Sequence, residues 1–380
     1  MKCLHIANDY SGSKIYSNLF KHLDDNDFSQ TVYTAIRREN LIDNNKIDFR
    51  NEKSQIYYRH ILNIWTRVNF FHKKEKIFSD LLKELDNIES FDIIHAHTWF
   101  SDGAVAYELH KKYNIPYIIA VRSTDIKIFL KYFLHLRRYG IKILMNASKI
   151  IFISPSYRKM FIQNQFIKKR LKYFENKILI IPNGINQFWL NHINTKKSDY
   201  FGVFKILFIG TFIKRKNVHR LIKAVTNLNK SGFKCELLLV GGGGRYHYKI
   251  LKLISKYSFI RYLGEVYDKN RLKDLLATSN LFAMPSYNET FGLVYAEALT
   301  QSTLIMYAQN DGVDGIYSEK TGVKINPFSV QSIESGILAI AENYKEYNFN
   351  PTEETKVNDW ERIAKQYRNI YNFILNNDNS

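Results

Sequence analysis

The residues with the clearest chemical potential lie in the segment Glu289-Thr-Phe-Gly-Leu-Val-Tyr-Ala-Glu297. An apolar run before it ends in Pro-Ser at 285–286, so we expect a strand to end there and a helix to begin near Gly292. The first amides of a helix have no partner inside it and, together with the helix dipole, they attract anions. The segment therefore predicts a phosphate contact at the backbone of Phe291, Gly292 and Leu293.

The two glutamates of this segment suit a nucleotide sugar. The carboxylate of Glu289, in the loop before the helix, can accept hydrogen bonds from sugar hydroxyls. Glu297 follows about two helical turns later, where it can hold a ribose diol. The alternative is an ordinary capped helix with two surface glutamates.

A basic loop provides the complementary charge. In Ile209-Gly-Thr-Phe-Ile-Lys-Arg-Lys-Asn-Val218 a predicted strand ends at Gly210, and Arg215 and Lys216 precede a predicted helix. Cations in such a position suit a diphosphate whose negative charge grows as its bond to a sugar breaks. A solvated basic loop is the alternative.

Two glycine turns also follow predicted strands. Gly241 and Gly242 open a run of four glycines, and Gly12 lies in the turn Asn8-Asp-Tyr-Ser-Gly-Ser13. Glycine permits tight turns and close approach of a ligand to the backbone. We expect both turns, and Gly210 at the end of the preceding predicted strand, to border a nucleotide sugar, although a flexible turn explains the glycines of the two turns equally well.

These motifs fit two consecutive doubly wound α/β domains. Short Val/Ile/Leu/Phe-rich runs alternate with helical patterns, which is typical of parallel sheets covered on both faces. Strands are predicted at Cys3–Ala7, Thr31–Ile36, Asp92–His97, Tyr117–Val121, Ile150–Ser154 and Ile178–Ile181, and then at Lys205–Ile209, Leu237–Val240, Arg261–Leu263, Leu281–Met284 and Leu304–Tyr307. Open sheets of this class bind ligands at the carboxyl ends of their strands, and each motif above follows a strand.

The pattern restarts after a polar, asparagine-rich stretch. We therefore assign residues 1–185 to a first domain, 186–202 to a linker and 203–357 to a second domain that binds the nucleotide sugar. Two such domains are expected to face each other across a cleft.

Composition and the absence of certain sequence signals indicate which partners and which cellular location to expect. The 380 residues include 55 Lys+Arg and 36 Asp+Glu, and this net charge of +19 favours anionic partners such as phosphorylated substrates, acidic lipid or nucleic acid. The sequence shows no membrane-spanning run, secretion signal or nucleic-acid-binding motif. We expect a cytoplasmic protein without a nucleic-acid partner, in which Cys3 and Cys235 are reduced core residues.

Taken together, the motifs resemble the retaining glycosyltransferases of family 4, which have the GT-B fold, and within them a branch that builds bacterial polysaccharides. The similarity runs from His5 to about Leu375 and also includes Asp92-Ile-Ile-His-Ala-His97, Ile181-Pro-Asn-Gly184 and Asp359-Trp-Glu-Arg-Ile-Ala-Lys-Gln-Tyr367. It implies a C-terminal helix, residues 358–375, that crosses back to the first domain.

The resemblance also implies roles for single residues. Arg215 and Lys216 would neutralise the donor diphosphate, and Glu289 would grip the donor sugar. Glu297 would bind the ribose, and Gly12 would border the reacting centre. The resemblance implies sugar transfer with retention from a UDP- or GDP-sugar, without a metal ion or other cofactor.

Three positions depart from the family pattern. Arg122 follows the strand Tyr117–Val121 where many relatives have a histidine near the donor sugar. Because arginine stays protonated, Arg122 can bind phosphate or orient the sugar but cannot act as a base. Asp125 keeps its usual place as a candidate substrate contact. Thr211 replaces an arginine, and Gln301-Ser-Thr-Leu304 lacks a glycine and a proline found in relatives.

His95 and His97 lie two residues apart at the end of a predicted strand, so both side chains point to one side of the sheet. His97, nearer the strand end, is a candidate contact for acceptor or donor, whereas His95 is expected in the core. The pair lacks the further ligands of a metal site.

The acceptor is expected on the first domain, as a glycan or a lipid-pyrophosphate-linked chain. Residues 126–138 mix aromatic and cationic side chains at helical spacing, which suits an anionic membrane surface; an amphipathic core helix is the alternative. The resulting prediction is sugar transfer in capsule, exopolysaccharide or other surface-glycan assembly. A GT-B nucleotide-sugar epimerase and a non-catalytic basic binding protein remain alternatives.

Overall fold

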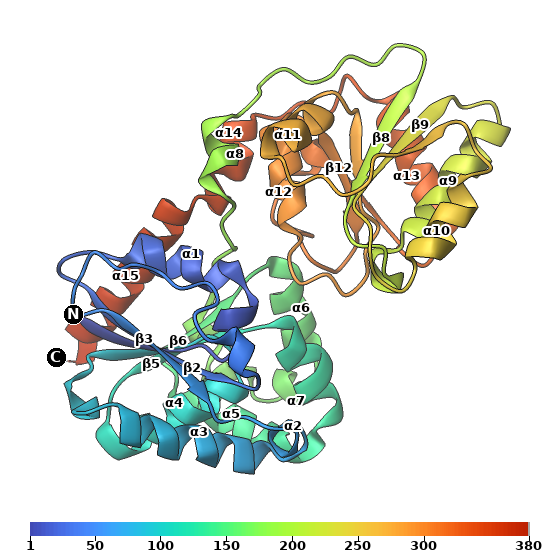
Figure 1. Ribbon diagram of the computed structural model, residues 1–380. Helices are drawn as coiled ribbons and strands as arrows, with labels where there is room; N and C mark the ends of the chain where they lie inside the picture. Colours follow the sequence, from blue (N-terminus) through green and yellow to red (C-terminus); the bar gives the residue numbers. More distant parts are fainter. Residues whose placement is uncertain (379–380) are drawn as a thin grey trace. The chain divides into compact units, whose positions relative to one another are not determined.

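The computed structural model describes residues 1–378, which form two compact units. The first unit contains Met1–Ile153, Tyr157–Gly184 and the C-terminal helix α15 (Trp360–Asp378), and the second contains Ile185–Asp359 with Ser154–Ser156. Each unit has its own parallel sheet with helices on both faces (Figure 1). The predicted fold class of two doubly wound α/β domains is confirmed.

The first unit has a seven-stranded parallel sheet in the order β3-β2-β1-β4-β5-β6-β7. Its strands are β1 (Lys2–Ile6), β2 (Ser29–Ile36), β3 (Gln55–His60), β4 (Ile93–Ala96), β5 (Tyr117–Val121), β6 (Lys149–Phe152) and β7 (Ile178–Ile180). Its other helices are α1 (Lys14–Leu23), α2 (Trp65–Val68), α3 (Phe70–Glu84), α4 (Ser101–Tyr113), α5 (Arg137–Asn146), α6 (Pro155–Gln163) and α7 (Gln165–Lys168). Helices α1 and α15 cover one face of the sheet, and α3, α4 and α5 cover the other (Figure 1).

Helix α15 belongs to the core of the first unit. Its residues Trp360, Ile363 and Tyr371 are buried in one cluster with Phe20 of α1 and with the sheet. At Gly184 an added Cβ would clash with the indole ring of Trp360, so glycine permits this close approach. The predicted return of the C-terminal helix to the first domain is therefore confirmed.

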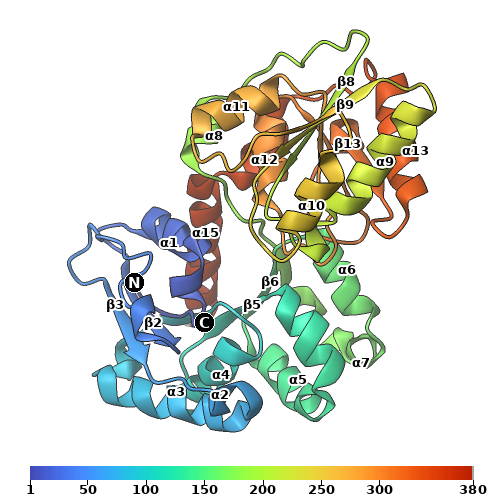
Figure 2. The ribbon, with the colours of Figure 1, turned by 45° about the vertical axis from the view of Figure 1, so that its right-hand side comes forward.

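The second unit has a six-stranded parallel sheet in the order β10-β9-β8-β11-β12-β13. Its strands are β8 (Phe204–Ile209), β9 (Cys235–Val240), β10 (Ile260–Tyr262), β11 (Leu281–Ala283), β12 (Leu304–Ala308) and β13 (Gly322–Ile325). Its helices are α8 (Gln187–Asn191), α9 (Val218–Lys230), α10 (His247–Ile254), α11 (Lys269–Ala277), α12 (Leu293–Thr300), α13 (Val330–Glu342) and α14 (Pro351–Thr355). Helices α9 and α13 pack together on one face, and α11 and α12 pack on the other (Figure 2).

Two segments differ from their predicted form. Residues 186–202, expected as an irregular linker, contain α8 and attach to the second unit, where Lys197 Nζ donates to the carbonyls of Tyr344 and Tyr347. Residues 126–138, expected as one amphipathic helix, form a π-helical turn, a 3₁₀ turn and the start of α5. The buried residues Leu130 and Leu136 are six apart, and a single α-helix would not place both on one face.

In both sheets the strand order reverses beside the first strand. The reversal lies between β1 and β4 in the first unit and between β8 and β11 in the second. Loops at the carboxyl ends of such strand pairs diverge, and open α/β sheets bind their ligands there. We call these two places the switch points of the units.

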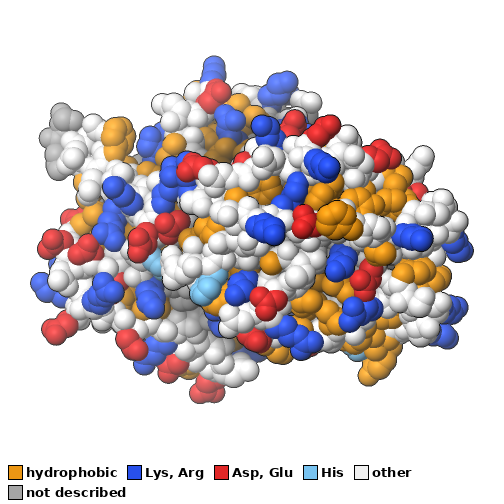
Figure 3. Space-filling model, turned by 90° about the horizontal axis from the view of Figure 1, so that it is seen from above, with side chains coloured by type: hydrophobic (Ala, Val, Ile, Leu, Met, Phe, Trp, Pro, Cys, Tyr) orange, Lys and Arg blue, Asp and Glu red, His pale blue; other side chains and the backbone are white. Residues whose placement is uncertain are grey.

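The distribution of surface charge and the state of the two cysteines agree with what the composition predicts. Lys and Arg side chains are interspersed with acidic ones over the face in Figure 3, so the excess positive charge is spread there. Cys3 and Cys235 are buried and free, as predicted. None of the helices within residues 1–378 combines the length and apolarity needed to cross a bilayer.

Candidate functional site

The basic loop and the glutamate motif meet at the switch point of the second unit. The loop 210–217 follows β8, and the loop 284–292 follows the neighbouring strand β11. The amide of Tyr287 donates to the carbonyl of Arg215 at 2.9 Å, so the two loops touch. Motifs far apart in the sequence therefore lie side by side.

Glu289 forms an ion cluster with the basic loop. Its Oε2 accepts hydrogen bonds from Lys216 Nζ at 2.6 Å and from Arg215 Nη1 at 3.3 Å. The side chains of Glu289 and Lys216 are only 12% and 15% exposed, whereas that of Arg215 is 44% exposed. The three groups carry one net positive charge, and partial burial strengthens its attraction for an anion.

The start of α12 lies beside this cluster. Gly292 caps the helix with φ 81°, and a Cβ there would lie 2.7 Å from the ring of Tyr295. Within the described part of the chain, the amides of Phe291, Gly292 and Leu293 donate to no acceptor. These amides and the helix dipole add partial positive charge next to Arg215 and Lys216.

Asn217 joins the basic loop to the loop after β11, a contact that the sequence did not reveal. Its backbone is left-handed with φ 61°, and its side chain is fully buried. Nδ2 donates to the carbonyls of Pro285 at 3.0 Å and Pro327 at 2.6 Å, while Oδ1 accepts from Arg220 at 2.9 Å. An asparagine just before a predicted helix signals a left-handed turn, but it does not identify these distant partners.

Asp311, in the loop after β12, fixes the backbone of Glu289. Its Oδ2 accepts from the amide of Glu289 and its Oδ1 from the amide of Gly312, both at 3.1 Å. Sequence reasoning missed Asp311, although its place just after a buried strand is the signal that identified the other motifs.

The glycines at this sheet edge are explained by contacts within the protein. A Cβ on Gly241 would clash with the carbonyl oxygen of Gly210, so the ends of β8 and β9 touch. A Cβ on Gly242 would come within 3.1 Å of both Glu265 Oε1 and the Tyr262 hydroxyl. Contact of Gly210, Gly241 and Gly242 with a nucleotide therefore stays a prediction.

Glu297 lies on α12 near Trp189 of α8 and Lys269 of α11. Burial raises the pKa of its carboxyl group to about 7, an effect partly offset by the charge of Lys269 and a hydrogen bond with Trp189. A carboxyl group that is partly protonated at neutral pH can both donate and accept hydrogen bonds, which suits a diol. The ribose contact stays a prediction.

In the first unit, Asp125 holds together the loops after β4 and β5. It is 2% exposed, and its oxygens accept hydrogen bonds from the amides of Trp99 at 3.0 Å, Phe100 at 3.1 Å and Arg122 at 2.9 Å. Burial raises the pKa of its carboxyl group to about 6. Since both oxygens are engaged by backbone, we interpret Asp125 as a positioning residue rather than a substrate contact.

Arg122 and Gly12 lie near the carboxyl edge of the first sheet. Arg122 Nε donates to the carbonyl of His97 at 3.1 Å, and its guanidinium lies 5.8 Å from the centre of the Tyr16 ring. Among residues 1–378 it forms no salt bridge, so its charge is available to an anion. A Cβ on Gly12 would meet no atom within 4 Å, and this open space can admit a ligand.

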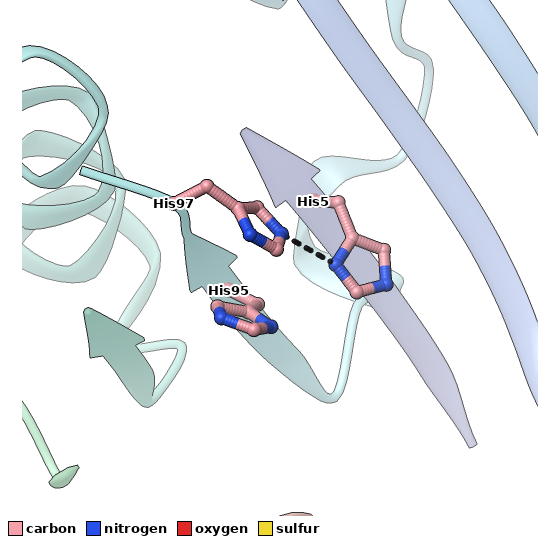
Figure 4. A group of neighbouring side chains, drawn as sticks. All are labelled: His5, His95 and His97. Atoms are coloured by element: carbon pink, nitrogen blue, oxygen red, sulfur yellow. Dashed lines mark hydrogen bonds between the residues drawn. The ribbon is translucent and has the colours of Figure 1, made fainter. Parts of the chain in front are cut away.

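His5, His95 and His97 form a buried cluster on β1 and at the end of β4 (Figure 4). His5 Nδ1 and His97 Nε2 share a hydrogen bond of 3.2 Å, and His95 Nδ1 lies 2.8 Å from the Tyr371 hydroxyl. Burial lowers the pKa of all three imidazoles, that of His5 to about 3. The cluster is therefore neutral at physiological pH.

The ring geometry of this cluster does not suit a metal ion, although one nitrogen from each ring lies within 4.8 Å of the others. The rings of His95 and His97 are stacked, with centroids 3.9 Å apart and planes 27° apart. Imidazole lone pairs lie in the ring plane, so two stacked rings cannot both point at one ion. His97 is also fully buried, so the structure places it in the core, like His95, and we do not retain it as a substrate contact.

Family models match both halves of the chain. The model for Glycosyltransferase Family 4 matches residues 15–187, and the model for Glycosyl transferases group 1 matches residues 171–356. An uncharacterized glycosyltransferase of Methanocaldococcus jannaschii is 28% identical over 300 residues, 76% of this chain and 77% of that protein. The putative teichuronic acid biosynthesis glycosyltransferase TuaC of Bacillus subtilis is 22% identical over 268 residues, 69% of this chain and 64% of TuaC.

Solved structures share the fold. Sucrose-phosphate synthase from Thermosynechococcus elongatus has a TM-score of 0.72 at 19% identity and covers 98% of this chain and 99% of its own. HepE of Anabaena, solved in complex with UDP, has a TM-score of 0.68 at 16% identity and covers 97% of this chain and 99% of its own. Glycosyltransferase family models therefore match both halves of the chain, and the chain shares the GT-B fold of these solved structures.

Proposed function

We propose that the protein transfers a sugar from a nucleoside-diphosphate sugar to a glycan or lipid-linked acceptor, with retention and without a metal ion or other cofactor. The observation that carries the proposal is the cluster of Glu289, Arg215 and Lys216 beside the open start of α12. A carboxylate for sugar hydroxyls, two cations and free amides thus lie together at the switch point of the second unit.

The leaving diphosphate is held by positive charge. As the bond between the anomeric carbon and the phosphate oxygen breaks, negative charge grows on that oxygen, and Arg215, Lys216 and the amides at residues 291–293 stabilise it. The acceptor hydroxyl forms the new bond on the same face of the sugar and gives its proton to the leaving oxygen. This route needs no separate base, which agrees with an arginine at position 122.

In this proposal Glu289 pairs with the cations in the free protein and with sugar hydroxyls once the donor is bound. In the free protein its Oε2 pairs with Lys216 and Arg215. A bound diphosphate shares these cations, and the carboxylate then has oxygens available for sugar hydroxyls. Glu297 binds the ribose in this proposal, Arg122 orients the transferred sugar, and Gly12 borders the reacting centre.

The finer assignments rest on similarity. HepE was solved with UDP, which supports a UDP-sugar ahead of a GDP-sugar as the donor. The name of TuaC refers to teichuronic acid biosynthesis, which supports a role in surface-glycan assembly. We place this activity in the cytoplasm.

The test combines product analysis with a matched pair of variants. Incubation with UDP- and GDP-sugars and lipid-linked or glycan acceptors, followed by mass spectrometry, should reveal a glycosylated acceptor. Lys216→Ala should lower the transfer rate by about 10²- to 10³-fold, the usual effect of losing one group that stabilises a transition-state charge. Lys214→Ala, in the same turn but exposed, should leave the rate unchanged.

An unchanged rate in Lys216→Ala would remove the proposed role of this cation. Conversion of the donor into another nucleotide sugar without an acceptor would instead identify an epimerase.

A further inference from the structure

The first unit exposes a set of large apolar side chains that we call the apolar patch. It consists of Ile64, Trp65, Val68, Phe71, Tyr132 and Leu134. Ile64, Trp65 and Val68 are 73%, 70% and 72% exposed. Single exposed apolar residues are normal, but three of this size within one short helical segment mark an interaction surface.

The two segments that carry the apolar patch contact each other through neighbouring aromatic rings. Phe70, at the start of α3, packs against Phe129 with ring centroids 6.1 Å apart, and Phe71 packs against Tyr139 at 5.6 Å. Residues 64–71 follow the carboxyl end of β3, and residues 129–134 follow that of β5. The apolar patch therefore lies at the sheet edge where the acceptor is expected.

The two sequence segments that carry the apolar patch are basic, although Lys74 at the end of the first one pairs with Glu75 and Glu108. Residues 61–74 contain three Lys or Arg and residues 126–149 contain six, and neither segment contains an Asp or Glu. The chain as a whole has 36 acidic residues in 380, so about four would be expected in these 38 positions. Among the described residues, Arg67, Lys131 and Arg138 are exposed and form no salt bridge.

We propose that the apolar patch docks on an anionic lipid bilayer. Tryptophan and tyrosine favour the boundary between headgroups and acyl chains, aliphatic side chains enter the acyl region, and nearby Lys and Arg bind acidic headgroups. The apolar side chains and unpaired cations found here match this combination. A bilayer held at this edge would present a lipid-linked acceptor to the enzyme, so the inference rests on the proposed function and names the partner surface.

Flotation with vesicles tests the apolar patch directly. The full chain should float with phosphatidylcholine vesicles that contain about 30% phosphatidylglycerol, and much less with phosphatidylcholine alone, because basic residues near the surface add to binding. The double variant Trp65→Ser/Val68→Ser should lower the partition coefficient by about tenfold or more, since it removes apolar area from the docking face. The charge variant Arg67→Gln/Lys131→Gln should lose most of the preference for phosphatidylglycerol.

The matched control is Tyr248→Ser, which removes an aromatic side chain that is 85% exposed on α10 of the second unit and should float like the wild type. Equal flotation of the wild type and Trp65→Ser/Val68→Ser, or no binding of the wild type to acidic vesicles, would overturn the inference. Nucleoside-diphosphate affinity, measured on the same variants, should stay unchanged. If Trp65→Ser/Val68→Ser no longer floats but keeps its nucleoside-diphosphate affinity and still transfers sugar to a soluble acceptor, the docking surface is supported. If the wild type floats but has no transferase activity, only the proposed function is contradicted.

Discussion

The side-chain amide of Asn217 bonds to the carbonyls of Pro285 and Pro327, which belong to two different loops of the second unit. Pro285 begins the segment that leads to Glu289, and Asn217 itself directly follows Lys216. The amide therefore couples the position of the cation to that of the carboxylate. Asn217 is fully buried and is not expected to touch the donor, so we regard it as a positioning residue.

Asn217→Ala should lower the free energy of unfolding by about 2–4 kcal/mol, because two buried carbonyls lose their donor and alanine is strained in a left-handed conformation. It should also weaken nucleoside-diphosphate binding by about tenfold as the two loops separate. Urea unfolding and calorimetric titration measure these effects. Asn217→Gly relieves the backbone strain and should recover part of the stability without recovering the affinity. Wild-type affinity in both variants would contradict the positioning role.

Sequence reasoning identified residues of the site that follow a strand directly. Arg215, Lys216 and Glu289 were found because each lies in a loop after an apolar run. Their contact could not be predicted, because it depends on β8 and β11 being neighbours although β9 and β10 intervene in the sequence. Asp311 was accessible to the same reasoning, whereas the partners of Asn217 required the folded structure.

At the scale of elements, the two strands that sequence reasoning missed are both at sheet edges. β3 and β13 each have a neighbour on one side only. The residues of β3 are partly exposed throughout, and two of the four residues of β13 are not buried. Edge strands need no continuous apolar run, and β3 and β13 lack one, whereas the other two edge strands, β7 and β10, were predicted. The fold class was still predicted correctly, because the fully buried central strands define it.

The pairing of β1 with β4 brings His5 opposite His95 and makes the first unit sensitive to acid. Burial lowers the pKa of His5 to about 3, so below pH 6.5 the unfolded chain binds a proton that the folded chain does not. The contribution of neutral His5 to the free energy of unfolding is fully present above pH 6.5. It is lost as the pH falls towards 3, at up to about 1.4 kcal/mol per pH unit. His95 and His97 act in the same direction.

His5→Gln should therefore reduce the acid sensitivity of the first unit. Between pH 6.5 and 5.5 its free energy of unfolding should fall by about 1 kcal/mol less than that of the wild type. Urea unfolding at both pH values measures this difference. His72→Gln, which changes an exposed histidine, should behave like the wild type. Identical pH slopes for wild type and His5→Gln would show that His5 is charged in the folded protein.

At the scale of the molecule, the restart of the strand pattern correctly indicated two units. The segment 186–202 was assigned to neither because its composition is polar, yet it bonds to the second unit through Lys197 and other residues. Polar composition describes contact with solvent, and it does not exclude hydrogen bonds to a neighbouring surface. Similarly, α15 is separated in sequence from the rest of the first unit but completes its core.

Each unit has its own sheet and core, and the proposed diphosphate site of Arg215, Lys216 and Glu289 lies wholly in the second. A nucleoside diphosphate should therefore stabilise the folded second unit alone, by about 2.7 kcal/mol at a free concentration of 100 Kd. For a unit of this size, calorimetry should show one of two unfolding transitions rising by about 5–10 °C with UDP while the other stays in place. Lys216→Ala should need more nucleotide for the same shift. The transition of the first unit can be recognised because its acid sensitivity is reduced by His5→Gln. If UDP raised the temperature of that transition, a site confined to the second unit would be contradicted.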